Sequence, residues 1–369
     1  MWNHGQDKIL RIIQAIEQGF NKIIEAHRKD QLIDLIKLYN ETFKPVKKIP
    51  PCQFSSAIFP LEPVKDYKPS DLRLSDLHME SGGLREFLNN QKIAVGTLDS
   101  STYNSGPHIT VNITVVNVGY WYMNYETNNG GDGNYAEVIL NVSGGIDEQI
   151  CIKDIEFKVL DDILIEKLNG DKKFLLLDES LSLIYTLSWT MEARKLMAQK
   201  IGDIIENALK SDIIPVGVYY TRTADIVRGM LTAIGKSLEE LPIIPDRTLL
   251  NHVLSKGSRS PLFIVHSKPL QEIGLEILCF YVKLGERNII RVEFPREAMN
   301  TANDIHNVVL LQSILGGGYP LAMQRAHEMA VLRADERRII EEEICRRLNI
   351  PTVDYLLSKK VISKRWPIV

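Results

Sequence analysis

The sequence predicts an α/β protein in which helices flank a mixed sheet. Two apolar, strand-like runs, 93–98 and 174–177, each end at an acidic residue, Asp99 and Asp178. Alternating segments typical of antiparallel strands follow the first run, and a helical segment separates them from the second. A further helix and strand come after the second run, so parallel and antiparallel neighbours are expected in one sheet.

Composition is ordinary for a globular protein: 369 residues, 44% hydrophobic, 25% charged, which allows one large or two medium domains. A net charge of −3 excludes a global basic field, so a nucleic acid would need a local basic groove, such as one built by an oligomer. The four cysteines form no CxxC pair, and neither a membrane-spanning run nor a signal-peptide pattern occurs. We therefore expect a cytoplasmic protein that contacts no membrane.

Four regions are expected along the chain. Residues 1–50 form an N-terminal helical arm, since apolar residues recur at three-and-four spacing over 8–44. Residues 51–90 form a wrapping segment rich in proline, which ends in a short helix. Residues 91–348 form the main domain, and residues 349–369 form a basic tail.

The elements of the main domain follow from periodicity and from turn residues. The predicted strands are 93–98, 108–118, 119–125, 135–142, 174–177, 213–220 and 262–266, with a hairpin of 275–284 and 288–294. A turn is expected at 128–133, and the predicted helices are 152–168, 181–210, 224–241, 249–254, 304–315 and a last long helix from Pro320 to about Leu348.

The acids at the two strand ends suggest a metal site. With this connectivity the two strands can lie side by side, which would place Asp99 and Asp178 at one edge of the sheet. The helix between them offers Glu156, Asp161, Asp162 and Glu166, of which one can face the same point. Converging carboxylates suit Mg²⁺ or Mn²⁺, and a pair of such ions can activate water for phosphodiester cleavage. This is a ribonuclease-H-like arrangement; the alternative is a sheet whose loop acids face water.

A second candidate group lies near the C-terminal helix. Glycines precede Tyr319 and Pro320, which allows a sharp turn into a helix, and His327 follows two turns later. A neutral imidazole can bind Mn²⁺ or transfer a proton, and a phenol can donate a hydrogen bond to a phosphate. The alternative is that His327 is an ordinary core or surface group.

Five motifs in this order resemble the NurA nucleases of archaea and some bacteria, over about Lys92 to Glu341. They are VGTLDSS around Asp99, FLLLDESLS around Asp178, DRTLL at Asp246, FYVKLGERNIIRVEFP, and GGYPLAMQRAHEMAVL around His327. The ordered set, together with the two Asp strands, makes the resemblance specific.

The resemblance implies a ribonuclease-H-like, Mn²⁺-dependent DNA nuclease, with Mg²⁺ as the alternative metal. It implies 5′-to-3′ exonuclease activity and endonuclease activity on single-stranded DNA. It also implies a homodimer around a DNA channel, docked on a hexameric HerA-type helicase that resects DNA ends for recombinational repair. The metal ligands would be Asp99, Asp178, His327 and a helical acid, for which Glu156 is our choice and Asp161 the alternative. Tyr319 would complete the catalytic set.

The sequence also departs from the family pattern. Where the family has Asp-Gly-Ser, this chain has Asp99-Ser100-Ser101 and Asp178-Glu179-Ser180, and Arg222 stands near a position where the family often has Lys. Loss of the glycine and the added charge of Glu179 support a second hypothesis. The chain would then be a weak or inactive NurA-like paralogue that serves as a regulatory or structural partner of the DNA translocase.

Overall fold

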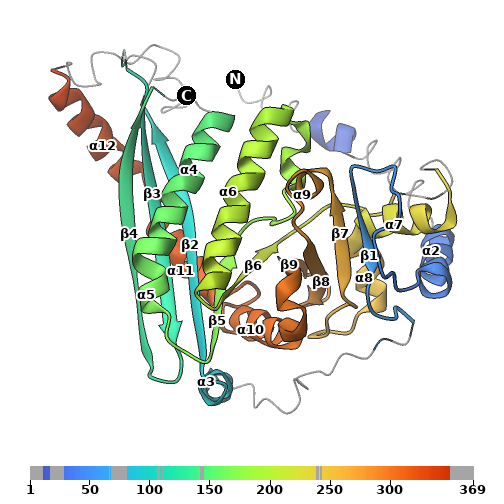
Figure 1. Ribbon diagram of the computed structural model, residues 1–369. Coiled ribbons are helices and arrows are strands. Elements are labelled where there is room, and N and C mark those ends of the chain that lie inside the picture. The colour runs from blue at the N-terminus through green and yellow to red at the C-terminus, as the bar shows by residue number, and fades with distance from the viewer. Residues whose placement is uncertain are drawn as a thin grey trace. The chain divides into compact units, whose positions relative to one another are not determined.

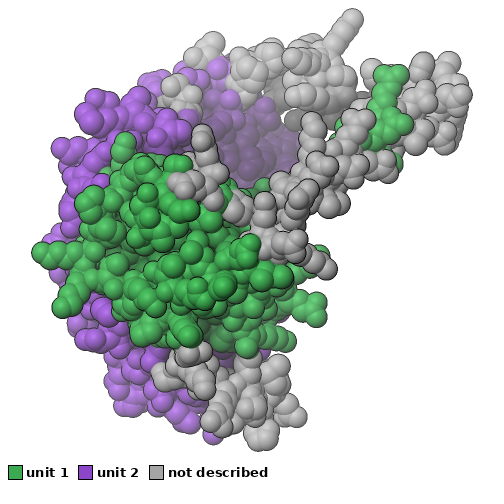
Figure 2. Space-filling model, turned by 90° about the vertical axis from the view of Figure 1, so that its right-hand side faces the viewer, with its two compact units in different colours: residues 1–71, 220–268, 276–292 green, residues 72–219, 269–275, 293–369 purple. Residues whose placement is uncertain are grey.

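The computed structural model describes residues 11–16, 29–65, 67, 81–105, 109, 111–141, 145–237, 241 and 243–349. The chain divides into two compact units, which are coloured separately in Figure 2. Unit 1 comprises 1–71, 220–268 and 276–292, and unit 2 comprises 72–219, 269–275 and 293–369. The predicted four-region division stays a prediction, and its basic tail beyond Asn349 lies outside the described residues. Within the described ranges no helix is long and apolar enough to cross a membrane.

Unit 2 contains a mixed five-stranded arrangement. Its strands neighbour one another in the order β6 (Ile213–Tyr219), β5 (Lys172–Leu177), β2 (Ile93–Asn104), β3 (Ile113–Asn124) and β4 (Asn129–Leu140). The β6–β5 and β5–β2 pairs are parallel, whereas β2–β3 and β3–β4 are antiparallel. The predicted α/β class, a mixed sheet flanked by helices, is therefore confirmed.

Helices cover both faces of these strands (Figure 1). α4 (Ile146–Val159) and α6 (Met191–Lys210) lie over one face, and α11 (Leu321–Ala330) lies over the other. A π-helical turn, Leu160–Leu164, continues α4 into α5 (Ile165–Lys167). The remaining helical elements are α3 (Ser81–Asn90), α9 (Lys268–Ile273), α10 (Ala302–Leu315), α12 (Ala334–Arg347) and the 3₁₀ turns Ile184–Ser188 and Arg296–Thr301.

Several predicted boundaries in unit 2 are wrong. α4 begins at Ile146 rather than at 152, and α6 begins at Met191 rather than at 181. β2 does not end at Leu98, because its polar residues through Asn104 continue to pair with β3. Residues 113–124 form one strand rather than parts of two. The predicted turn at 128–133 instead begins β4, since the space beside Gly131 and Gly133 is filled by tyrosine rings of β3. A Cβ at Gly133 would lie 2.5 Å from the Tyr120 hydroxyl.

The prediction of one long C-terminal helix is also wrong, because residues 331–333 are not helical and separate α11 from α12. Side chains from the sheet bind the end of α11: Ser101 Oγ donates to the Ala330 carbonyl at 2.5 Å, and Asn117 Nδ2 does so at 2.8 Å. α12 then starts afresh, with Glu336 accepting from the Arg333 amide at 2.6 Å. Polar capping by the sheet thus ends a run whose sequence alone favours helix.

Unit 1 contains β1 (Ser56–Pro60), β7 (Phe263–Ser267), β8 (Ile277–Lys283) and residues 289–292 of β9 (Ile289–Pro295), in that order. The β1–β7 and β7–β8 pairs are antiparallel. Its helices are α2 (Lys29–Thr42), α7 (Asp225–Ile234) and α8 (Asp246–Val253). α2 and residues 11–16, both helical, lie within the predicted helical arm. Tyr39 of α2 and Phe43, the residue after this helix, are buried in the core of unit 1.

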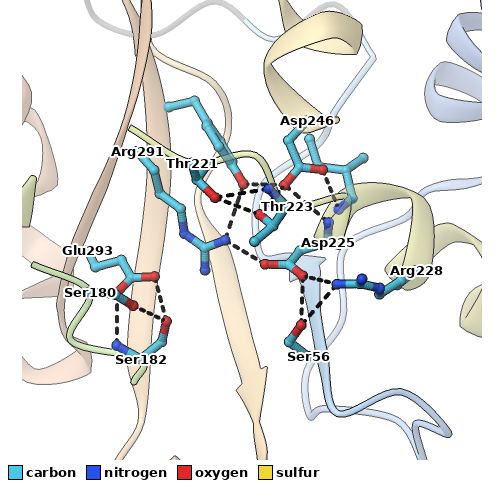
Figure 3. Close-up of polar contacts among 12 residues, drawn as sticks. Ser56, Ser180, Ser182, Thr221, Thr223, Asp225, Arg228, Asp246, Arg291 and Glu293 are labelled. Atoms are coloured by element: carbon cyan, nitrogen blue, oxygen red, sulfur yellow. Dashed lines mark hydrogen bonds and ion pairs between the residues drawn. The ribbon is translucent and has the colours of Figure 1, made fainter. Parts of the chain in front are cut away.

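A buried polar network crosses the core of unit 1 (Figure 3). Arg291 pairs with Asp225 at 2.7 Å, and both side chains are fully buried. Asp246 caps the start of α7 by accepting from the amides of Asp225 at 3.1 Å and Ile226 at 2.9 Å. Tyr281 also donates to Asp246, at 2.6 Å. Burial, and then the charge of Asp225, raise the pKa of Asp246 from 3.8 to about 7.

This raised pKa predicts that the free energy of unfolding decreases with pH. Folded Asp246 keeps its proton to about pH 7, whereas the unfolded residue releases it near 3.8. Between pH 3.8 and about 7 the folded state therefore binds more protons than the unfolded state. The stability that protonated Asp246 contributes at low pH is lost as the pH rises through about 7. In Asp246→Asn, the free energy of unfolding measured in urea between about pH 5 and pH 8 should lose this slope, which for one proton is at most about 1.4 kcal/mol per pH unit.

The matched control is Asp34→Asn, which changes an exposed aspartate of α2 in the same unit. It should keep the pH dependence of the parent. An unchanged slope in Asp246→Asn would contradict the assignment of the titration to Asp246.

Candidate active site

Asp99 and Asp178 lie at the same level, where the parallel pairing of β2 with β5 ends. The parallel register of β2 and β5 ends at the Leu98–Leu177 pair, and the two aspartates are the next residue on each strand. Burial raises the pKa of Asp178, and the charge of Asp99 raises it further, although the Tyr319 hydroxyl and His327 oppose this. The charge of Asp99 thus disfavours the ionised form of Asp178, and a cation bound near both carboxylates would offset this repulsion.

Tyr319 and His327 approach these two carboxylates from the C-terminal part of the chain. The Tyr319 hydroxyl lies 2.7 Å from Asp178 Oδ1 and 3.2 Å from the carbonyl oxygen of Val218. His327 Nδ1 lies 2.7 Å from Asp99 Oδ2, and the imidazole side chain is 67% exposed. With Nδ1 engaged, Nε2 is the ring nitrogen that can bind a metal or transfer a proton. The structure thus joins four of the five predicted site residues in two hydrogen-bonded pairs, Tyr319 with Asp178 and His327 with Asp99, on neighbouring strands.

The position of His327 depends on a close approach of α11 to β3. Gly119, which pairs with Asp99 across the β2–β3 ladder, faces α11. A Cβ at position 119 would overlap the backbone oxygen of Ala326 and the backbone nitrogen of Ala330. The end of α11 is also held by Ser101 and Asn117, as described above. The absent side chain and these two bonds together fix the helix that carries His327.

The turn that leads into α11 is fixed by backbone freedom and by two glutamines. Gly317 and Gly318 have φ of 69° and 123°, values that favour glycine. Gln312 Oε1 accepts from the Ala322 amide at 3.0 Å, and Gln324 Nε2 donates to the carbonyl oxygens of Gly316 and Tyr319 at 2.6 and 2.9 Å. Tyr319 is thereby held at the entrance of the helix.

Glu293 fixes the loop after Asp178, a role that the sequence did not predict (Figure 3). Its carboxylate accepts from the Ser182 amide at 2.9 Å, from Ser182 Oγ at 2.7 Å and from Ser180 Oγ at 3.2 Å. The Tyr219 hydroxyl donates to it at 2.8 Å. These bonds hold a loop in which Leu183 adopts a φ of 57°, which is unusual for a branched residue. No local sequence signal pairs residue 293 with residue 182.

Glu156 belongs to a neighbouring group on the α4 side of the strands. Successive side chains of a strand leave opposite faces, so Asp99 contacts His327 of α11 whereas Ser100 contacts α4. Ser100 Oγ donates to Glu156 Oε1 at 2.7 Å, and its amide donates to Asp99 Oδ1 at 2.8 Å. Ser100 therefore connects the two groups through hydrogen bonds.

Lys153 is the centre of this second group. Its ammonium lies 2.6 Å from Glu156 Oε2 and 2.7 Å from Glu179 Oε2. Burial lowers the pKa of Lys153, but the charges of Glu156 and Glu179 outweigh burial and raise it well above its ordinary value. Burial raises the pKa of Glu179, while the charge of Lys153 opposes this. Lys153 was not predicted; its spacing of three from Glu156 was the available signal.

The other predicted acid, Asp161, lies elsewhere. It sits in the π-helical turn, and its Oδ1 accepts from Asn207 Nδ2 of α6 at 3.0 Å in an exposed position. Among the described residues, no three His, Cys, Asp or Glu side chains are already gathered in a geometry that could hold a metal ion. The donor chemistry of Asp99, Asp178 and His327 nevertheless fits Mn²⁺ or Mg²⁺, because repulsion between the carboxylates would be relieved there. Glu156 is not available as a metal ligand in this arrangement, since its Oε2 is paired with the Lys153 ammonium at 2.6 Å.

Part of the chain resembles a known protein family in sequence, and most of it resembles a solved structure in fold. Residues 194–332, which include Tyr319 and His327, match the NurA domain. The crystal structure of the NurA nuclease from Sulfolobus solfataricus is similar over 95% of this chain and 98% of that one, with 16% identity and a TM-score of 0.54. The fold of that nuclease is therefore shared along most of the chain.

More distant likenesses include a NurA bound to dAMP and manganese, with 12% identity, a TM-score of 0.41, and coverage of 96% of this chain and 98% of that one. No curated protein sequence matches this chain.

The packing of α11 on the sheet predicts the effect of Gly119→Ala. The added methyl group meets backbone atoms that cannot rotate away, so α11 must shift from β3. We expect the free energy of unfolding to fall by roughly 1–3 kcal/mol, as measured by urea denaturation.

The matched control is Gly202→Ala in α6, where a Cβ would meet only Ile273 Cδ1 at 3.8 Å. This change should be neutral or stabilising by up to about 1 kcal/mol, because alanine favours helix. Equal stability of the two variants would rule out the close approach of α11 as a determinant.

Proposed function

We propose that this protein is a divalent-metal-dependent DNA nuclease, with Mn²⁺ as the metal and Mg²⁺ as the alternative. The observation that carries the proposal is the meeting of Asp99, Asp178, Tyr319 and His327, which come from segments far apart in the sequence. Two carboxylates, a phenol and an imidazole beside the end of the β2–β5 pairing suit phosphodiester hydrolysis better than a structural role. The NurA domain and the shared fold support the same reading.

In this proposal each side chain has a distinct role. Asp99 and Asp178 would hold the metal, which when bound supplies Lewis acidity and an activated water. Asp99 orients the His327 ring through Nδ1, which leaves Nε2 to bind the metal or to take a proton. The Tyr319 hydroxyl, beside Asp178, would donate to a phosphate oxygen. The predicted role of Glu156 stays a prediction.

The finer activity rests on the resemblance. We propose 5′-to-3′ exonuclease and single-strand endonuclease action on DNA ends, by a cytoplasmic homodimer that works with a hexameric HerA-type helicase in end resection. Its ribonuclease-H-like character is part of the same proposal, supported by the mixed strand order of unit 2.

The contact between Lys153 and Glu156 favours a second candidate function. If Glu156 is needed as a third carboxylate, its pairing with an ammonium would leave the chain weak or inactive. The protein would then serve as a regulatory or structural partner of the translocase.

The test is cleavage of single-stranded and double-stranded DNA by the purified full chain in Mn²⁺. We expect cleavage, and a loss of roughly 100-fold or more in Asp99→Asn and in His327→Ala, since each removes a group that acts on the reacting centre. Asp171→Asn, which changes an exposed acid paired with Lys92 at 3.8 Å, should keep the parent rate. Binding of the HerA-type partner without cleavage in any divalent metal would favour the second function.

A further inference from the structure

The group formed by Lys153, Glu156 and Glu179 is built like a cation site that is already filled by a side chain. The three side chains are 14%, 7% and 15% exposed, so water screens their charges weakly. Each oxygen of Glu156 has a donor: Ser100 Oγ at Oε1 and Lys153 Nζ at Oε2. Glu179 anchors the ammonium from the opposite side.

This arrangement affects Glu156 in particular. A divalent ion at Glu156 Oε2 would have to displace or approach an ammonium that lies 2.6 Å away, at a high Coulombic cost in a poorly screened site. Asp99 and Asp178 have no such obstacle, because their partners are a histidine and a tyrosine. The two sides of the strands therefore differ in their readiness to accept a metal.

We propose that Lys153, held in place by Glu179, competes with the divalent cation for Glu156 and thereby limits the affinity of this chain for the metal. Lys153 and Glu179 are positioning residues in this view. The inference rests on the proposed metal site at Asp99 and Asp178. It makes Glu179, the residue that follows Asp178, a determinant of the metal requirement.

The experiment measures Mn²⁺ binding to the full-length protein without DNA, by electron paramagnetic resonance of free Mn²⁺. The double variant Lys153→Met/Glu179→Gln loses one positive and one negative charge, so the net charge of the protein is unchanged. We expect it to bind Mn²⁺ roughly tenfold tighter than the parent, because a charged hydrogen bond no longer competes. Adding Glu156→Gln to the double variant should cancel the gain.

Two further variants separate competition from general electrostatics. Lys158→Met removes a lysine of the same helix, which contacts Tyr135 at 2.6 Å and Glu137 at 3.1 Å, and should bind Mn²⁺ as the parent does. Glu156→Gln alone should change the affinity of the parent by less than about twofold, whereas Asp99→Asn should weaken it at least tenfold. This last pair of measurements holds even if the double variant fails to fold.

Equal affinity of the parent and a folded double variant would overturn the proposal. So would a loss in Glu156→Gln as large as that in Asp99→Asn, since Glu156 would then already bind the metal. If either result is obtained and the parent protein still cleaves DNA, the proposed nuclease function stands and only the competition by Lys153 is rejected. If the double variant binds Mn²⁺ more tightly but the protein does not cleave DNA, the competition by Lys153 stands and the proposed nuclease function is rejected.

Discussion

The candidate site depends on the parallel pairing of β2 with β5. Because the register of this pair stops at Leu98 and Leu177, the next residues, Asp99 and Asp178, emerge at one level. Both flanking leucines are buried, so the apolar strands fix where the two carboxylates lie. A slip by one residue would turn one of the aspartates to the other face and separate the pair.

Around this pair the structure sorts the polar groups by strand face. Asp99 and Ser101 bond to α11, whereas the residue between them, Ser100, bonds to Glu156 of α4. Strand alternation therefore explains why His327 joins the aspartates, and why Glu156 is found with Lys153 instead. It also connects the positive charge of Lys153 to Asp99 by hydrogen bonds through two intervening residues, Glu156 and Ser100.

Part of this arrangement could be predicted from the sequence. Apolar runs that end in acids predicted the adjacency of Asp99 and Asp178, and the glycine turn before Pro320 predicted a helix that carries His327. The continuation of β2 could not be predicted, since the polar residues after Leu98 resemble a turn until β3 is known to pair with them. Lys153 and Glu293 were missed because their roles depend on contacts with Glu179 and Ser182, which no local pattern encodes.

The capping of α11 by the sheet holds two side chains of the candidate site, Tyr319 and His327, through one short helix. Ser101 and Asn117 bind its last turn, and the glycine turn before it carries Tyr319, so the tyrosine and the histidine are fastened to the same short helix. Loosening of that helix on heating would detach both at once while the five strands of unit 2 stayed paired. The protein would then lose its active arrangement as a unit, at a temperature below that at which the sheet melts.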